Sequence, residues 1–163
     1  MSTSFRRILH PTDFSPASEL ALSRAIELAT SLGAQLHLLH VVEDLVYQPW
    51  MMEPYAVNFR EILESTKQES EARLSRMAEG LKVPTVTSCI IGRPVDGIVE
   101  YARDEQIDLV VMGSHGQTAV TRFLLGSVAE RVVRHAPCPV LTVRETIRGV
   151  RPGAIAHVAA TVA

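Results

Sequence analysis

The 163-residue sequence predicts a three-layer α/β fold, an open parallel sheet of five strands with helices on both faces. Short apolar runs alternate with longer segments of helical period along residues 7–143. Parallel strands in such an alternation are joined by right-handed crossover helices. The chain length and the 47% of apolar residues are sufficient for one domain with a single core. We therefore expect one domain at residues 1–144.

The first strand is expected over residues 7–12, and a helix is expected over residues 16–32. Ser15 can accept a hydrogen bond from the first turn of that helix, and Pro16 suits the first helical position because its missing N–H would have no partner there. Gly33 is expected to end the helix, since glycine tolerates the left-handed conformation found at helix C-termini.

The second strand is expected over residues 34–42, whose nearly continuous apolar character favours cover on both faces. His37 and His40 interrupt this apolar run, and we interpret both, like His10, as core or rim residues with satisfied hydrogen bonds. Residues 43–58 have no clear period and contain several aromatic and methionine residues. They are expected to form a loop, either a lid or a packing surface.

The later segments continue the alternation. A helix is expected over residues 59–81, with a solvated charged stretch at 64–73. The last strand is expected at an edge of the sheet because Pro137 and Pro139 flank it. The other expected elements are a strand at 84–91, a helix after Gly92-Arg-Pro94, a strand at 108–112, a helix at 128–134 and this last strand at 138–143.

Composition excludes several classes of function. The 16 basic and 18 acidic residues give no broad positive field, and aromatic residues are too few for a base-stacking platform, so nucleic acid is not an expected partner. Cys89 and Cys138 lack the spacing of a zinc site or a disulfide framework. With no apolar run of membrane-spanning length, we expect a cytoplasmic protein.

Residues 145–163 have no convincing pattern and are expected to form a flexible tail.

Residues 110–130 run from an apolar strand through three glycines into a helix. Glycine permits close approach of a ligand, and a helix N-terminus offers N–H groups and a partial positive charge, so this segment predicts a phosphate cradle. Asp13 and the segment after Val42 also follow strands. Because ligands bind beyond the carboxyl ends of parallel strands, we expect all three segments to border one crevice.

Three segments resemble the universal stress protein family over about residues 5–144. The most specific match is the pattern G-x2-G-x9-G-[S/T], which marks the ATP-binding branch of that family. The resemblance implies a Rossmann-like fold, similar to the adenine nucleotide alpha hydrolases, with strand order 3-2-1-4-5. The segments are Ile8-Leu-His-Pro-Thr-Asp-Phe-Ser15, Asp108-Leu-Val-Val-Met-Gly-Ser-His-Gly116, and Leu124-Leu-Gly-Ser-Val-Ala-Glu-Arg131 with His135-Ala-Pro-Cys-Pro-Val-Leu141.

The resemblance also implies which residues bind ATP. Asp13 is expected to accept hydrogen bonds from the ribose hydroxyls, although an aspartate there can instead cap the following helix. His115 either contacts phosphate or faces water. The other implied residues are Pro11 and Thr12 beside the adenine, Val41 with its backbone at the adenine edge, Met112 and Gly113 near the ribose and phosphates, and Gly116, Gly126, Ser127 and Val128 as phosphate donors.

Binding elements are clearer in this sequence than catalytic ones. Gln117 and Ala119 stand where many family members have a basic residue and a glycine, and Arg122 is the one cation near the phosphates. The two lysines, Lys67 and Lys82, lie outside the glycine segment, so a P-loop is absent. A Mg²⁺ ion bridging the ATP phosphates is plausible without a protein-only metal site.

We therefore expect an ATP-binding sensor or signalling protein of the stress response with at most slow hydrolysis. The alternatives are an ATP hydrolase or nucleotide-transferring enzyme, and a partner-binding module that does not depend on a nucleotide. The resemblance implies a homodimer through the fifth strand, formed by Pro139, Val140, Leu141, Thr142 and Val143.

Overall fold

The computed structural model describes residues 5–44, 56–114 and 125–144. Strands and helices alternate along these residues, as the sequence predicts. The elements are β1 Arg7–Pro11, α1 Pro16–Leu32, β2 Gln35–Glu43, α2 Ala56–Glu79, β3 Thr85–Gly92, α3 Pro94–Asp104, β4 Leu109–Gly113, α4 Ser127–His135 and β5 Val140–Val143.

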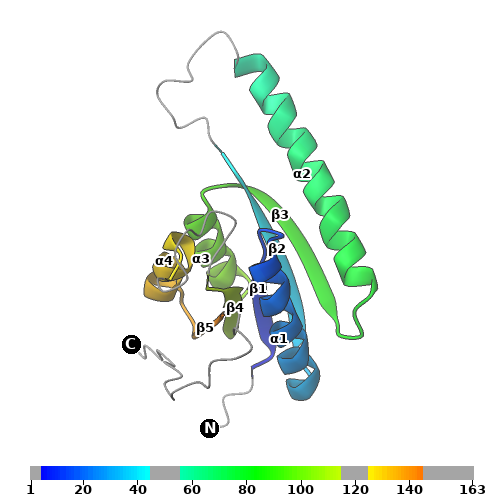
Figure 1. Ribbon diagram of the computed structural model, residues 1–163, viewed down its shortest axis with the longest axis vertical. Coiled ribbons are helices and arrows are strands. Elements are labelled where there is room, and N and C mark those ends of the chain that lie inside the picture. The colour runs from blue at the N-terminus through cyan, green and yellow to red at the C-terminus, as the bar shows by residue number, and fades with distance from the viewer. Residues whose placement is uncertain (1–4, 45–55, 115–124, 145–163) are drawn as a thin grey trace, which may run out of the picture.

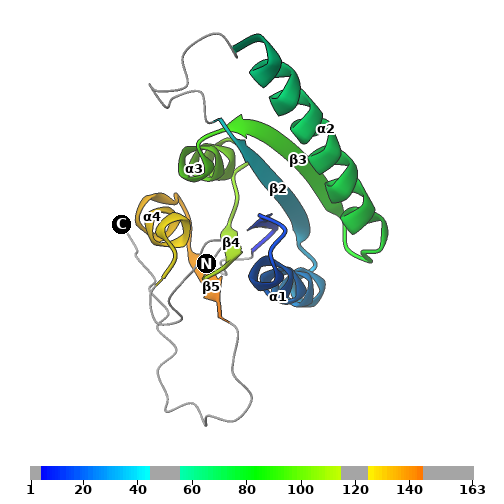
Figure 2. The same cartoon turned by 45° about the horizontal axis from the view of Figure 1, so that its top comes forward.

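The five strands form one parallel sheet in the order β3-β2-β1-β4-β5. Helices α1 and α2 cover one face of the sheet, and α3 and α4 cover the other (Figures 1 and 2). This arrangement confirms the predicted three-layer fold and strand order, and it confirms β5 as an edge strand. The direction in which strands are added reverses between β1 and β4, so the carboxyl ends of these two strands border the switch point of the sheet.

The ends of α1 follow the predicted signals. Ser15 is the N-cap, and its hydroxyl oxygen accepts a hydrogen bond from the Ser18 N–H (3.2 Å). Gly33 ends the helix with φ at 63°, and its N–H donates to the Ala29 carbonyl. These two contacts satisfy backbone groups that a helix end otherwise leaves without a partner.

Helix α2 differs from the prediction at both ends. It begins at Ala56 and ends at Glu79, whereas the sequence predicted residues 59–81. Because Glu43 belongs to β2, the predicted loop at 43–58 is shorter than expected. The predicted lid or packing role falls on residues 45–55, outside the described residues. The first turn of α2 has no acidic residue, so the local sequence does not mark the residue at which the helix begins.

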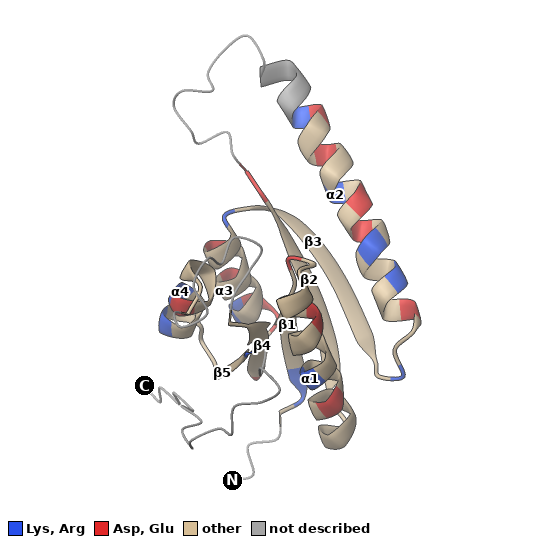
Figure 3. Cartoon of the chain, viewed as in Figure 1, with Lys and Arg blue, Asp and Glu red and all other residues tan. Residues whose placement is uncertain are grey.

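The stretch 64–73 of α2 is largely exposed and carries charges of both signs (Figure 3). The prediction of a solvated face is wrong at one position, Ser70. Ser70 is buried on the inner line of the helix, between Leu63 and Leu74 at helical spacing. The Arg73 guanidinium lies 4.2 Å from the centroid of the Phe14 ring. A small polar residue therefore lies on an inner face that hydrophobicity alone does not reveal, while the exposed Arg73 makes a cation–π contact with Phe14.

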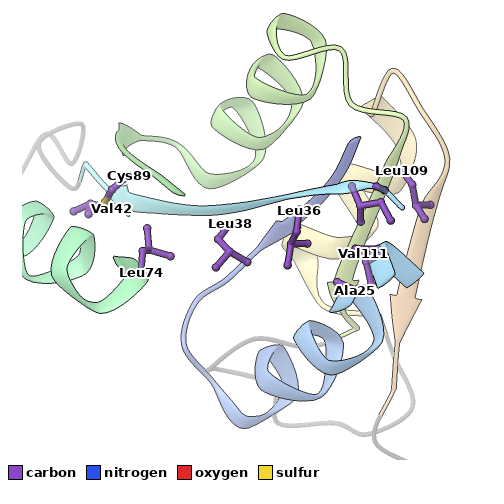
Figure 4. Packing of buried hydrophobic residues seen from close by; sticks show 11 residues of the cluster. Ala25, Leu36, Leu38, Val42, Leu74, Cys89, Leu109 and Val111 are labelled. Atoms are coloured by element: carbon purple, nitrogen blue, oxygen red, sulfur yellow. The ribbon is translucent and has the colours of Figure 1, made fainter. Parts of the chain in front are cut away.

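Alternate residues of the central strands supply two separate core clusters. Ile8 and Leu38 point toward α1 and α2, where Ala25 and Leu74 pack against the cluster shown in Figure 4. The intervening residues, including Leu9 and Val110, belong to the cluster under α3 and α4. The near-continuous apolarity of these strands thus reflects burial on both faces.

Candidate functional site

A cavity of about 330 Å³ lies at the carboxyl ends of β1, β2 and β4, against α3 and α4. This volume is within the range of ligand pockets, about 300–1,000 Å³. Every described residue of the predicted site lines it, and the other two, His115 and Gly116, lie outside the described residues. The structure thus brings together Pro11, Thr12, Asp13, Val41, Met112, Gly113, Gly126, Ser127 and Val128.

Further residues line the cavity that the sequence did not assign to the site. Leu39, Ile98 and Ala129 are buried apolar residues, and their sequence pattern cannot distinguish a cavity wall from a core. His40 did carry a signal, because it is a polar residue in an apolar strand. Ser18 and Pro94 complete this group.

Asp13 follows β1 and is half-buried at the cavity wall. Its Oδ1 accepts a hydrogen bond from the Ser15 N–H (3.0 Å), which closes a tight turn. Because Ser15 itself caps α1, the alternative interpretation of Asp13 as the helix cap is wrong. The turn places Asp13 in the cavity wall at the point where the chain passes from β1 to α1.

Phe14, the next residue, has a positive φ of 60°. This backbone conformation is unfavourable for a bulky residue and persists only where the surroundings fix it. The Phe14 N–H donates to Thr12 Oγ1 (3.0 Å), and its ring lies 4.5 Å from the His40 ring, with Arg73 also in contact. Three contacts from different elements therefore hold the residue beside Asp13.

His40 lies in the cavity wall and bonds to the same turn. Its Nδ1 is 2.7 Å from the Thr12 carbonyl oxygen, and because a carbonyl can only accept, this nitrogen carries a proton and donates it. The Thr12 N–H in turn donates to the Leu39 carbonyl (2.8 Å). The turn after β1 is thus fastened to β2.

His10 is fully buried behind the cavity, on the α1 side of β1. Its Nδ1–H donates to the Val111 carbonyl (2.9 Å), and its Nε2 lies 3.3 Å from Ser18 Oγ. Burial lowers the pKa of His10 from 6.5 to about 4, against weaker opposing effects of the Val111 hydrogen bond and the Asp13 charge. His10 is therefore neutral at pH 7.

The three strand histidines are core or rim residues with hydrogen-bond partners, as predicted. His37 Nδ1 lies 3.0 Å from the Tyr101 hydroxyl, away from the cavity. Burial lowers the pKa of His37 and raises the pKa of Tyr101 to about 12. Both groups are therefore uncharged at pH 7.

The backbone of Val41 faces the cavity. The last register pair between β1 and β2 is Pro11 with Leu39, so β2 continues past the end of β1. Backbone groups of alternate strand residues point to the same side, and the Leu39 carbonyl already bonds to the β1 side through Thr12. Val41 therefore presents its N–H and C=O toward the space where β1 has ended.

The start of α4 forms the opposite wall. The Gly126 N–H, one of the predicted phosphate donors, donates to the Ser114 carbonyl (2.8 Å), and Gly126 lines the cavity. The Glu130 N–H is the first to donate within the helix, to the Gly126 carbonyl, so the N–H groups of Ser127, Val128 and Ala129 have no partner within the described part of the chain. They provide three donors at the positive end of the helix dipole.

Two further features of the described residues bear on function. Within 5–44, 56–114 and 125–144, no three His, Cys, Asp or Glu side chains are close enough to hold a metal ion together. None of the helices in these ranges combines the length and apolarity required to span a bilayer.

A ligand-sized cavity outside strand carboxyl ends, at the reversal of strand order, is the defining arrangement of the doubly wound α/β proteins. Comparison with known proteins identifies the family within this class. The model of the universal stress protein family matches residues 4–144, and this chain belongs to that family.

Individual relatives agree with this assignment. The chain is 37% identical to universal stress protein MJ0531 of Methanocaldococcus jannaschii, over 86% of this chain and 83% of the relative. The solved structure of MJ0577 from the same organism superposes with a TM-score of 0.76 at 29% identity, covering 88% of this chain and 99% of that one. An Arabidopsis thaliana family member with AMP bound has the same fold, with a TM-score of 0.60 at 18% identity over 86% of this chain and 92% of that one.

Proposed function

We propose that this chain binds ATP in the cavity and acts as a nucleotide-dependent sensor or signalling protein of the stress response, with at most slow hydrolysis. The observation that carries the proposal is the placement of three different recognition groups around one cavity. These are the Asp13 carboxylate, the Val41 peptide groups and the N–H donors at the start of α4.

The proposed adenosine contacts match the chemistry of the β1 and β2 side. The Val41 C=O and N–H can pair with the amino group and a ring nitrogen of adenine, while Leu39, Ile98 and Met112 supply apolar walls for the base. The Asp13 carboxylate offers several acceptor sites to the two ribose hydroxyls.

The proposed phosphate contacts lie at the start of α4. The N–H groups of Ser127, Val128 and Ala129 point along the helix axis toward the carboxyl edge of the sheet, where an anion is stabilised by the dipole. The Ser127 hydroxyl adds a donor. Mg²⁺ would be held by phosphate oxygens and water, and His115 and Gly116 remain proposed participants outside the described residues.

Slow or absent hydrolysis is proposed because the described cavity lining supplies few catalytic groups. Asp13 and His40 are the titratable side chains among the described lining residues, and both are engaged in the turn after β1. Efficient phosphoryl transfer requires a positioned metal, a cation and a base or water-orienting group.

Titration calorimetry of ATP into the purified protein tests this function. Asp13→Ala should weaken ATP binding by at least about tenfold, because a hydrogen bond to a charged group contributes roughly 1.5–3 kcal/mol. Asp104→Ala, which removes an exposed carboxylate at the end of α3, is the matched control and should leave affinity unchanged. Absence of ATP binding by the folded wild-type protein would reject the proposal, and multiple-turnover release of ADP or AMP would favour the enzyme alternative.

We also propose a cytoplasmic homodimer that forms through residues 139–143. The supporting observation is that β5 is an edge strand, and its Leu141 side chain is exposed. Light scattering after size exclusion should give twice the chain mass, and Leu141→Glu should shift the protein toward monomer. A wild-type monomer at high micromolar concentration would contradict this assembly.

A further inference from the structure

Three buried polar residues connect the Asp13 turn to the interior. His10, Ser18 and Thr12 are 0%, 4% and 6% exposed, and we call them the buried polar chain. Ser18 Oγ lies 2.9 Å from Thr12 Oγ1 and 3.3 Å from His10 Nε2. The buried polar chain is anchored to β4, because His10 Nδ1–H donates to the Val111 carbonyl. It therefore crosses from β4 through β1 to α1.

Thr12 is the member of the buried polar chain that lines the cavity. All its polar atoms make hydrogen bonds within the protein: the N–H with Leu39, the C=O with His40, and Oγ1 with both Phe14 N–H and Ser18. Thr12 lines the cavity, yet its hydrogen-bonding groups already serve the protein. Its contribution to ligand binding is thus one of geometry.

The geometry that Thr12 controls is the left-handed conformation of Phe14. A residue of this size adopts a positive φ at a cost, and the hydrogen bond from its N–H to Thr12 Oγ1 is one of the contacts that hold it there. Asp13 lies between these two residues, so a relaxed Phe14 would rotate the peptide groups on which the Asp13 carboxylate depends.

We propose that the buried polar chain positions the Asp13 carboxylate for the ribose of a nucleotide. Ser18 and His10 are positioning residues in this inference, since neither is required to touch the ligand, and Thr12 transmits their effect. The inference rests on the proposed function, because it presupposes that Asp13 binds ribose. It predicts a specific loss, that of ribose discrimination, rather than a general loss of affinity.

The test compares ATP with 2′-deoxy-ATP by calorimetry. The wild-type protein should prefer ATP by about tenfold, the effect of a hydrogen bond to a charged group. Thr12→Val keeps the side-chain shape but removes Oγ1, and Ser18→Ala breaks the chain further back. Both should reduce the ATP preference at least about threefold. Thr12→Ser retains the hydroxyl and should keep the preference.

Ser23→Ala is the matched control for Ser18→Ala, because it removes an exposed hydroxyl of the same helix that donates to the Glu19 carbonyl. Circular dichroism establishes that each variant is folded, and Thr12→Val with Thr12→Ser suffices if Ser18→Ala is not. An unchanged ATP preference in the folded Thr12→Val protein, with ATP still bound, overturns this inference alone. Failure of the wild-type protein to bind either nucleotide overturns the proposed function and this inference with it.

Discussion

The two faces of the sheet are built from alternate residues of the same strands, but one face forms a packed core and the other borders the cavity. Under α1 and α2, which have 17 and 24 residues, Ile8, Leu36 and Leu38 are fully buried in one continuous cluster (Figure 4). Under α3 and α4, which have 11 and 9 residues, the apolar layer borders the cavity. The difference teaches that the long helices mainly stabilise the sheet, whereas the short ones supply most of the helical residues that line the cavity.

Truncation of one large side chain on each face gives the largest expected effect. Leu38→Ala should lower the free energy of unfolding by about 2–5 kcal/mol, since Leu38 is completely buried. Ile98→Ala should cost less stability, because this residue adjoins an existing cavity, but it should weaken ATP binding. Urea denaturation and calorimetry measure both quantities. Equal stability losses with no effect of Ile98→Ala on binding would remove the distinction between the faces.

The packed face also contains His10, and this residue makes the free energy of unfolding of the protein depend on pH. Because the folded pKa of about 4 lies below the unfolded value of 6.5, the unfolded state binds more protons between these values, and stability falls as pH decreases through this window. From pH 6.5 to 5 the loss due to His10 should be about 1.5 kcal/mol. His10→Gln should show a correspondingly smaller loss in denaturant titrations. Parallel pH profiles of the two proteins would show that His10 does not carry this dependence.

Gly97 tests how closely the other face is packed next to its cavity. A Cβ at this position would lie 2.8 Å from Ile90 Cδ1 and 3.3 Å from Val41 Cγ2. In Gly97→Ala the helix-propensity gain of about 1 kcal/mol should be largely cancelled by this crowding, while displacement of Val41 weakens ATP binding about threefold. Ile90→Val removes the closest atom, so adding it should restore affinity. A double variant no better than Gly97→Ala would contradict this explanation.

The smallest effect on stability is expected for an exposed ion pair that belongs to neither core cluster. Arg134 and Glu130 form an exposed ion pair (2.9 Å) on α4, with 68% and 52% of their side chains accessible. Arg134→Gln should change the free energy of unfolding by less than about 0.5 kcal/mol, and the change should vanish in high salt. A larger, salt-independent loss by thermal or urea unfolding would mean that α4 contributes more to stability than its packing indicates.

The sequence predicted the elements well where local chemistry and periodicity agree. Ser15, Pro16 and Gly33 define α1 because each satisfies a requirement of a helix end. The start of α2 lacked such a signal, and the buried position of Ser70 depends on tertiary packing that a polar side chain conceals. Strand order 3-2-1-4-5 came from the family resemblance, since no local pattern encodes which strands become neighbours.

The sequence predicted which residues lie together at the cavity better than it predicted their hydrogen bonds. Asp13, Val41 and Gly126 all line the cavity, as the resemblance implied. The loss of the Gly126 N–H to Ser114 and the saturation of Thr12 were not predictable, because both depend on partners brought together by folding.

The central position of β1 also sets the order in which a growing chain can complete its structure. Asp108 Oδ2 accepts the N–H groups of Arg6 and Arg7 (2.8 and 2.9 Å), about a hundred residues earlier in the chain. As synthesis proceeds from the N-terminus, β1, β2 and β3 can assemble first. One edge of β1 then stays unpaired until β4 has been synthesised. The wall formed by α4 arrives later still. A nascent chain that lacks β4 and α4 therefore has no complete site, and a ligand can stabilise only the complete fold by binding to it.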